Sequence, residues 1–164
     1  MPADGPGLIL DLSAVQAKLG TLELAAKGSG SPGDLSTGPL PRAAVAVILR
    51  TGENATQLLV IERATHERDP WSGHLAFPGG RADTGDATGR DTAIRETREE
   101  LGLDLRVHGR FLGAWEAVRS AGPGLPKLEI EPYAFAVDRV PPLQLDQREV
   151  QRVFWVPIGP LLRG

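Results

Sequence analysis

The chain has 164 residues, of which 41% are hydrophobic, 24% are charged and 5% are aromatic, and its formal net charge is -3. A chain of this length can build one hydrophobic core but is too short for two full domains. The slight negative charge and the lack of a basic tract argue against a protein that coats nucleic acid. The absence of cysteine excludes disulfides, thiolate nucleophiles and zinc ribbons.

We expect two parts in this chain: residues 1–40 form an N-terminal arm with a linker, and residues 41–164 form the globular domain. Residues 9–26 could form a short helix, whereas residues 27–41 are rich in Gly, Ser and Pro and indicate a flexible linker. The N-terminus contains neither a basic start nor a long apolar run. We therefore expect no signal peptide, no membrane span and a cytoplasmic location.

The globular part begins with a predicted β-hairpin, in which two apolar runs, residues 43–50 and 57–63, flank a turn at residues 51–56. Three later apolar runs predict strands over residues 111–118, 128–137 and 153–156. One strong helix pattern lies among these strands. This order indicates a mixed α/β domain with a curved sheet, and not a regular alternation of strands and helices.

The helix is framed by capping signals at both ends. Thr88 and Asp91 resemble a capping box, and Gly102 stands where a left-handed C-cap is expected, so we predict about three helical turns. One face of this helix should pack on the sheet, because residues suited to a buried face recur at i, i+3 and i+7: Ile94, Thr97 and Leu101.

Three acids of this helix, Glu96, Glu99 and Glu100, are spaced to share a neighbouring face. In the simplest interpretation the face is solvated, Arg95 pairs with Glu99, and Arg98 screens the rest, each pair contributing about 0.2–0.5 kcal/mol. Two carboxylates about 6 Å apart, however, repel by roughly 3 kcal/mol at an effective dielectric constant near 20. A divalent cation would reverse this repulsion, and Mg²⁺ or Mn²⁺ prefers carboxylate oxygen and leaves positions open for a phosphate.

The segment FPGG, residues 77–80, lies upstream of the helix. Glycine has no side chain, so the backbone at Gly79 and Gly80 can approach a phosphate or a metal closely. A tight turn alone would also explain two glycines. The functional hypothesis therefore depends on their combination with the helix acids.

The stretch from Gly80 to Leu103 resembles the Nudix box, G-x5-E-x7-R-E-U-x-E-E-x-G-U, where U is apolar. Every core position from Arg95 onward matches except Thr97, where an apolar residue is usual. Upstream, Asp86 stands for the first Glu, and eight residues instead of seven separate it from Arg95. The resemblance implies an α/β/α sandwich in which the box forms loop-helix-loop. It also implies Mg²⁺-assisted hydrolysis of a nucleoside diphosphate derivative.

The resemblance also implies roles for individual residues. The catalytic group would consist of the helix acids and the arginine beside them: Arg95, Glu96, Glu99 and Glu100. The three glutamates would bind Mg²⁺ or Mn²⁺, with the carbonyl oxygen of Gly80 as a further ligand, and Arg95 would orient them. A base must also take the proton of the attacking water. Three acids are candidates between which the sequence does not choose: Glu96, Asp146 and Glu149.

A second resemblance concerns the substrate. Residues 62–81, ERATHERDPWSGHLAFPGGR, are similar to the signature of coenzyme A pyrophosphatases, with one extra residue between Arg68 and Gly73. Guanidinium groups match phosphate oxygens, although Arg63 and Arg68 could also form ordinary surface ion pairs. The implied substrate contacts are Arg63, Arg68, Phe77, Gly79 and Gly80.

These observations favour a diphosphatase that splits coenzyme A or acyl-coenzyme A into 3′,5′-ADP and the corresponding phosphopantetheine. Two alternatives remain: the same chemistry on ADP-ribose, dinucleotides or nucleoside triphosphates, and a non-catalytic module that senses a nucleotide. We expect a small-molecule partner and neither nucleic acid nor a membrane, and a homodimer is left open. Family members usually continue into a final helix, so any element here that starts at Pro157 should be very short or absent.

Overall fold

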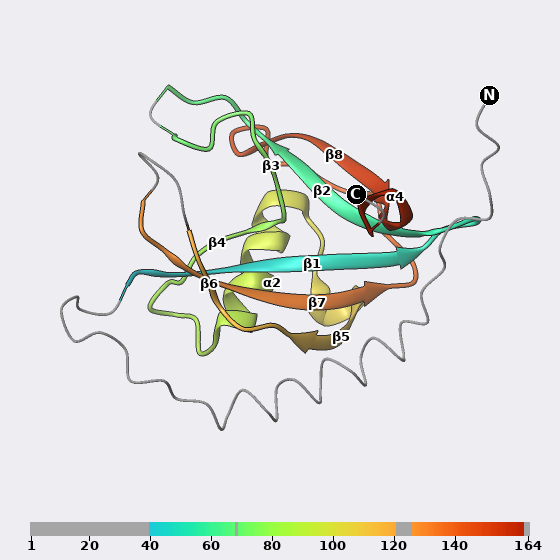
Figure 1. Cartoon of the computed structure of the whole chain (residues 1–164), viewed down its shortest axis with the longest axis horizontal. Helices are drawn as coiled ribbons and strands as arrows, with labels where there is room; N and C mark the ends of the chain where they lie inside the picture. The colour runs from blue at the N-terminus through green and yellow to red at the C-terminus, as the bar shows by residue number, and fades with distance from the viewer. Residues whose placement is uncertain (1–39, 68, 121–125, 163–164) are drawn as a thin grey trace.

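The computed structural model describes residues 40–67, 69–120 and 126–162, which form a mixed β-sheet packed against helices (Figure 1). The strands are β1 (Arg42–Thr51), β2 (Thr56–Arg63), β3 (Leu75–Ala76), β4 (Gly79–Arg81), β5 (Gly109–Ala114), β6 (Val118–Arg119), β7 (Glu129–Val137) and β8 (Val150–Pro157). The helices are α2 (Gly89–Leu101), α3 (Leu105–His108) and α4 (Ile158–Leu162). The predicted arm and linker lie outside the described residues.

The sheet follows the order β3-β2-β1-β7-β5, with β4 paired to β1, β6 paired to β7 and β8 paired to β2. Strands β1 and β7 run parallel, whereas the other pairs are antiparallel. The predicted hairpin is confirmed, because β1 and β2 pair antiparallel with Leu49 opposite Leu58. The prediction of a mixed sheet is confirmed as well.

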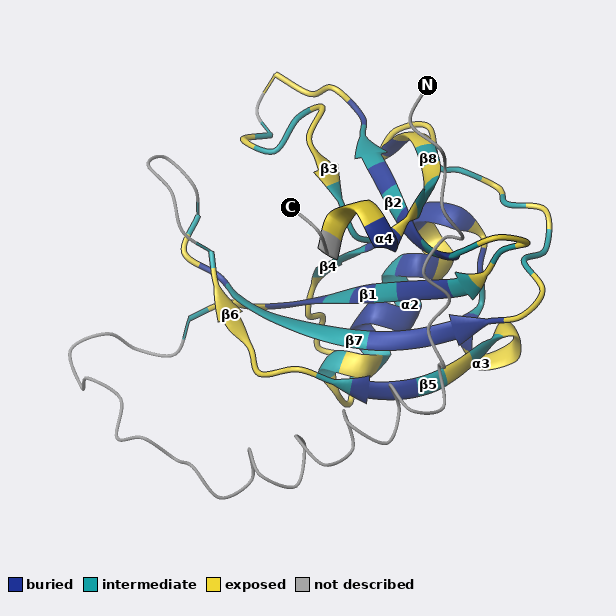
Figure 2. Ribbon diagram, turned by 45° about the vertical axis from the view of Figure 1, so that its right-hand side comes forward, coloured by how far each residue is buried: buried dark blue, intermediate teal, exposed yellow. Residues whose placement is uncertain are grey.

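Helix α2 covers one face of the sheet and buries the three residues predicted to face it, Ile94, Thr97 and Leu101. Figure 2 shows this buried side of the helix against the strands. Successive residues of a strand point to opposite faces, so a second core cluster forms on the other side of the sheet. Its buried members come from four strands and from α4: Leu49, Leu58, Leu112, Ala134, Ala136 and Ile158.

The predicted strand over residues 111–118 is wrong in its length. Strand β5 ends at Ala114, and β6 starts only at Val118. The pairing with β7 shifts register between Phe111 and Gly113, and such an irregularity bends a strand and ends regular pairing. Trp115 therefore lies outside the strand and is 39% exposed. After β8 the described residues include one short helix, α4, of five residues.

The ends of α2 lie at the predicted caps. The Oγ1 atom of Thr88 accepts a hydrogen bond from the N–H of Asp91 at 3.2 Å. At the other end Gly102 has a left-handed conformation with a φ of 67°, and its N–H donates to the carbonyl oxygen of Arg98 at 2.9 Å. These caps fix where the helix starts and stops, and with it the position of its acids.

We predict that Gly102→Ala lowers the free energy of unfolding by about 1–2 kcal/mol, because an L side chain is strained in the left-handed region. A Cβ atom there would also lie 3.0 Å from the Cβ atom of Gln144. Urea unfolding measures the effect. Gly85→Ala is the matched control, since a Cβ atom at Gly85 meets nothing within 4 Å. Equal losses in the two variants would contradict this account of the cap.

Candidate active site

Three carboxylates from two segments of the chain converge beside the C-terminal half of helix α2. One carboxylate oxygen from each of Glu96, Glu100 and Glu149 lies within 4.8 Å of the others. Glu96 and Glu100 belong to α2, whereas Glu149 lies in the turn before β8. We call these three residues the acidic cluster. Carboxylate oxygens alone form a donor set that suits a hard divalent cation such as Mg²⁺ or Mn²⁺.

The two glycines of the FPGG segment lie directly against this cluster. The N–H of Gly79 donates to Oε2 of Glu100 at 3.0 Å. A Cβ atom on Gly80 would lie 2.6 Å from the carboxylate of Glu96, and one on Gly79 would lie 2.2 Å from the carbonyl oxygen of Ala44. A side chain at Gly79 would collide with the backbone of the sheet, so glycine is required there, whereas a side chain at Gly80 would displace the Glu96 carboxylate from its present position.

The Glu100 carboxyl is almost completely buried, since the residue is 1% exposed. Burial raises its pKa to about 8, because a desolvated carboxylate is difficult to ionise. The N–H of Gly79 and the charge of Arg63 lower this pKa, whereas Glu96 and Glu149 raise it further. Burial also raises the pKa of Glu96. A cation held by these oxygens would favour the ionised forms.

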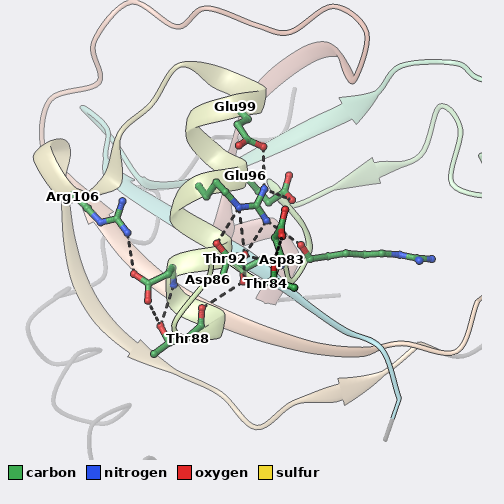
Figure 3. A network of polar contacts seen from close by, with 11 residues as sticks. Asp83, Thr84, Asp86, Thr88, Thr92, Glu96, Glu99 and Arg106 are labelled. Carbon is green, nitrogen blue, oxygen red and sulfur yellow. Dashed lines mark hydrogen bonds and ion pairs between the residues drawn. The ribbon is translucent and has the colours of Figure 1, made fainter.

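Arg95 binds three acids at once (Figure 3). Its Nη1 donates to Oε1 of Glu96 at 2.9 Å and to Oε2 of Glu99 at 3.0 Å. Its Nε and Nη2 each bind a different oxygen of Asp86 at 3.0 Å. These contacts are those expected of a residue that orients neighbouring acids.

Asp86 anchors the hydrogen-bond network around Arg95. Its side chain is 7% exposed and also accepts hydrogen bonds from the hydroxyl of Thr92 and the N–H of Asp83, each at 2.9 Å. The hydrogen bond from Arg95 is the main reason that the pKa of Asp86 lies well below its usual range. Although Asp86 departs from the Nudix box in residue type and spacing, it forms an ion pair with Arg95, the arginine of the box.

Glu99 does not join the acidic cluster, although the resemblance assigns it to the metal. Its side chain is 51% exposed and pairs with Arg95. At 100° per helical residue, Glu99 points nearly opposite to the face that buries Ile94 and Leu101, whereas Glu100 lies at the margin of that face. The structure thus brings two of the three predicted ligands together with Glu149.

Among the candidate bases, Glu96 and Glu149 lie in the acidic cluster and Asp146 does not. Asp146 pairs instead with Arg148 at 2.6 Å, and the hydrogen bonds from that guanidinium lower its pKa to about 2. The sequence offered no signal to separate Glu149 from Asp146, since they lie three residues apart in one loop.

The predicted substrate contacts other than the two glycines do not share one environment. Arg63 ends β2, and its Nε and Nη2 bind Oδ2 of Asp69 at 3.2 and 2.9 Å. No pattern in the sequence indicates this partner. Phe77 is partly buried and packs against the second core cluster, whereas Arg68 lies outside the described residues.

We predict that the metal-free protein loses stability as the pH rises from about 5 to about 8. In this range the unfolded chain ionises Glu100, whose ordinary pKa is 4.5, while the folded chain keeps the proton because its pKa is about 8. The folded state then binds more protons than the unfolded state, so the free energy of unfolding decreases with pH. Urea unfolding in EDTA across this range measures the slope.

Glu100→Gln should make this slope shallower, and Glu99→Gln should change it less, because the charge of Glu99 acts on Glu96 and not on Glu100. Glu96 contributes in the same direction, so part of the slope remains in the Glu100 variant. An unaltered slope in Glu100→Gln would show that the buried carboxyl is not its source.

Comparison with known proteins places this geometry in a family. Residues 40–163 match the family model described as the NUDIX domain. The mitochondrial coenzyme A diphosphatase NUDT8 of Homo sapiens is 32% identical over 123 residues, which cover 74% of this chain and 50% of that protein. The peroxisomal coenzyme A diphosphatase ndx-8 of Caenorhabditis elegans is 33% identical over 111 residues, covering 67% of this chain and 45% of that protein. The chain thus spans half of these relatives or less.

A solved structure, the binary complex of an Ap4A hydrolase from C. elegans, has the same fold with a TM-score of 0.60 and 20% identity, covering 76% of this chain and 85% of that one. In the described part of the chain, no helix combines the length and the apolar character of a bilayer-spanning segment. Because the family model covers most of the sequence, the chain belongs to the NUDIX domain family.

Proposed function

We propose that this chain is a divalent-metal-dependent hydrolase that cleaves the diphosphate linkage of a small nucleoside diphosphate derivative. The acidic cluster beside Gly79 and Gly80 is the observation that carries the proposal. Carboxylates this close repel one another, and Glu100 is also buried. A cation bound between them would offset both costs.

Glu96, Glu100 and Glu149 would hold the cation, and the family resemblance adds the Gly80 carbonyl oxygen and Glu99. When bound, Mg²⁺ or Mn²⁺ offsets charge on the diphosphate oxygens and lowers the pKa of a coordinated water. The protein's own groups set the geometry. The N–H of Gly79 fixes one oxygen of Glu100, and the guanidinium of Arg95 fixes one oxygen of Glu96.

Hydrolysis needs a group that takes the proton of the attacking water. Two of the candidate bases, Glu96 and Glu149, belong to the acidic cluster. One oxygen of Glu96 already accepts a hydrogen bond from Arg95, so this oxygen is not free to accept a proton from water. Glu149 is exposed and lies in a turn open to water, so we assign the base to Glu149.

The substrate that we favour is coenzyme A or an acyl derivative, split into 3′,5′-ADP and the corresponding phosphopantetheine. Two observations support it: the signature between Arg63 and Gly80, and two relatives that are named coenzyme A diphosphatases. Arg63 stands opposite Val150, the residue that follows Glu149, in the pairing of β2 with β8, which places Arg63 beside the turn that carries a carboxylate of the cluster. Phe77 is a weaker candidate for substrate contact, because its ring packs in the core.

Two alternative functions remain. The same centre could act on ADP-ribose, dinucleotides or nucleoside triphosphates. A non-catalytic sensor is disfavoured, because a module that only binds a nucleotide gains nothing from the repulsion within the acidic cluster. A cytoplasmic location stays a prediction from the sequence and a homodimer stays open, whereas the two relatives are named as mitochondrial and peroxisomal proteins.

With Mg²⁺ at mildly alkaline pH, we expect coenzyme A to give the highest kcat/KM among coenzyme A, ADP-ribose, NADH and diadenosine polyphosphates. Liquid chromatography of the products measures it, since 3′,5′-ADP should appear with phosphopantetheine. Preference for another member of this panel would replace the substrate. Tight nucleotide binding without turnover of any member would support the sensor.

Glu149→Gln should lower kcat by about 10²–10⁴-fold, the range expected when a positioned acid–base group is lost. Glu100→Gln should also lower kcat strongly, because it removes a buried carboxylate of the cation site. Glu99→Gln should cost less, because Glu99 lies with Arg95 outside the acidic cluster. Circular dichroism checks that the variants are folded. If Glu99→Gln is as damaging as Glu100→Gln, the ligand set implied by the resemblance is the correct one.

A further inference from the structure

His66 lies in the loop between β2 and β3, and its side chain contacts the turn that carries Glu149. The ring Nε2 forms a hydrogen bond with the carbonyl oxygen of Arg148. A carbonyl oxygen only accepts, so Nε2 must carry the hydrogen and donate it. Because Arg148 directly precedes Glu149, this contact acts on the backbone from which the carboxylate projects.

The same turn is held elsewhere by backbone hydrogen bonds. On the helix side, the N–H of Asp146 donates to the carbonyl oxygen of Glu100 at 2.9 Å. On the loop side, the N–H of Ala64 donates to the carbonyl oxygen of Glu149 at 2.8 Å. Within the turn, the N–H of Arg148 also donates to Oδ1 of Asp146 at 3.0 Å. Of the contacts described here that reach the turn from other segments, the bond from His66 is made by a side chain, so it can be altered by substitution.

His66 is itself fixed within its loop. Its N–H donates to Oγ of Ser72 at 2.8 Å, and its carbonyl oxygen accepts from the N–H of Asp69 at 3.1 Å. The N–H of Arg63 donates to the carbonyl oxygen of His74 at 3.0 Å and closes the base of the loop. The ring of His66 is therefore presented by a backbone that is itself hydrogen-bonded at His66, in a loop whose Asp69 also holds Arg63.

We propose that His66 is a positioning residue, which holds the backbone of Arg148 so that the Glu149 carboxylate stays within the acidic cluster. This inference rests on the proposed function, because the position of Glu149 matters only if the cluster binds a cation and substrate. His66 acts through Glu149 and takes no part in the chemistry. A donor at the position of Nε2 is the required property.

Two amide substitutions test this requirement. The N–H donor of Gln reaches about as far as Nε2 of His, whereas the donor of Asn is one bond shorter. His66→Asn should weaken Mn²⁺ binding roughly 10–100-fold, the usual effect of losing a group that orients a ligand. It should also lower kcat while KM stays nearly constant, and His66→Gln should keep both close to wild type. Electron paramagnetic resonance of free Mn²⁺ measures the affinity.

Hydrogen exchange in EDTA tests the same point without metal or turnover. The amides of Ala64 and Val150 should exchange faster in His66→Asn than in wild type or His66→Gln, because both amides bond to the turn that His66 restrains. His74→Ala, which replaces an exposed histidine of the same loop, is the control and should match wild type.

The two proposals fail differently. Wild-type protein that binds no Mn²⁺ and turns over no substrate would refute the proposed function, and hydrogen exchange would still decide whether His66 restrains the turn. Unchanged exchange together with unchanged Mn²⁺ affinity in His66→Asn overturns the role of His66. Equal losses in His66→Asn and His66→Gln also overturn it, because the donor would then not be what matters.

Discussion

The burial of the Glu100 carboxylate is the constraint on which the site depends. A carboxylate without solvent is stable only where hydrogen-bond donors or cations replace the water. Gly79 supplies one donor, and it can do so because β4 pairs with β1 and carries the Gly79 N–H over the end of α2. The pairing places Gly79 opposite Val45 and Gly80 opposite Ala44, so the sheet aligns the glycines with the acids. The carboxylates of Glu96 and Glu149 lie close to that of Glu100, and this concentration of negative charge attracts a cation.

Arg95 binds two acids of its own helix, of which Glu96 belongs to the acidic cluster and Glu99 does not. Asp86 binds two of its nitrogen atoms, and this bidentate pair fixes the guanidinium in one orientation. The remaining nitrogen then reaches Glu96 and Glu99 together. Glu96 belongs to the acidic cluster and also pairs with Arg95, whereas Glu99 pairs with Arg95 outside the cluster. The extra residue between Asp86 and Arg95 is compatible with the pairing because the segment before the helix is a loop that can absorb it.

Local features of this chain could be predicted from the sequence, and features that depend on distant pairing could not. Both caps of α2 were predicted, because Thr88 and Gly102 act on backbone groups a few residues away. Strand β4 was missed, since its three residues become a strand only by pairing with β1. The motif indicated the acids on α2 but not their directions. Relative to the buried face, the helical period places Glu100 at the margin and Glu99 nearly opposite, and this distinguishes their directions.

The position of Arg63 shows how strand pairing completes the centre. Strands β2 and β8 pair in register from Gln57 to Glu62, and the register shifts at Arg63, which stands opposite Val150. A shift of this kind redirects the side chain that follows it. Arg63 is thereby released from the regular alternation of β2 and held by Asp69, where its charge acts on Glu100. Val150 directly follows Glu149. The pairing at this irregularity thus brings Arg63 beside the turn that carries the third carboxylate, although the two are far apart in sequence.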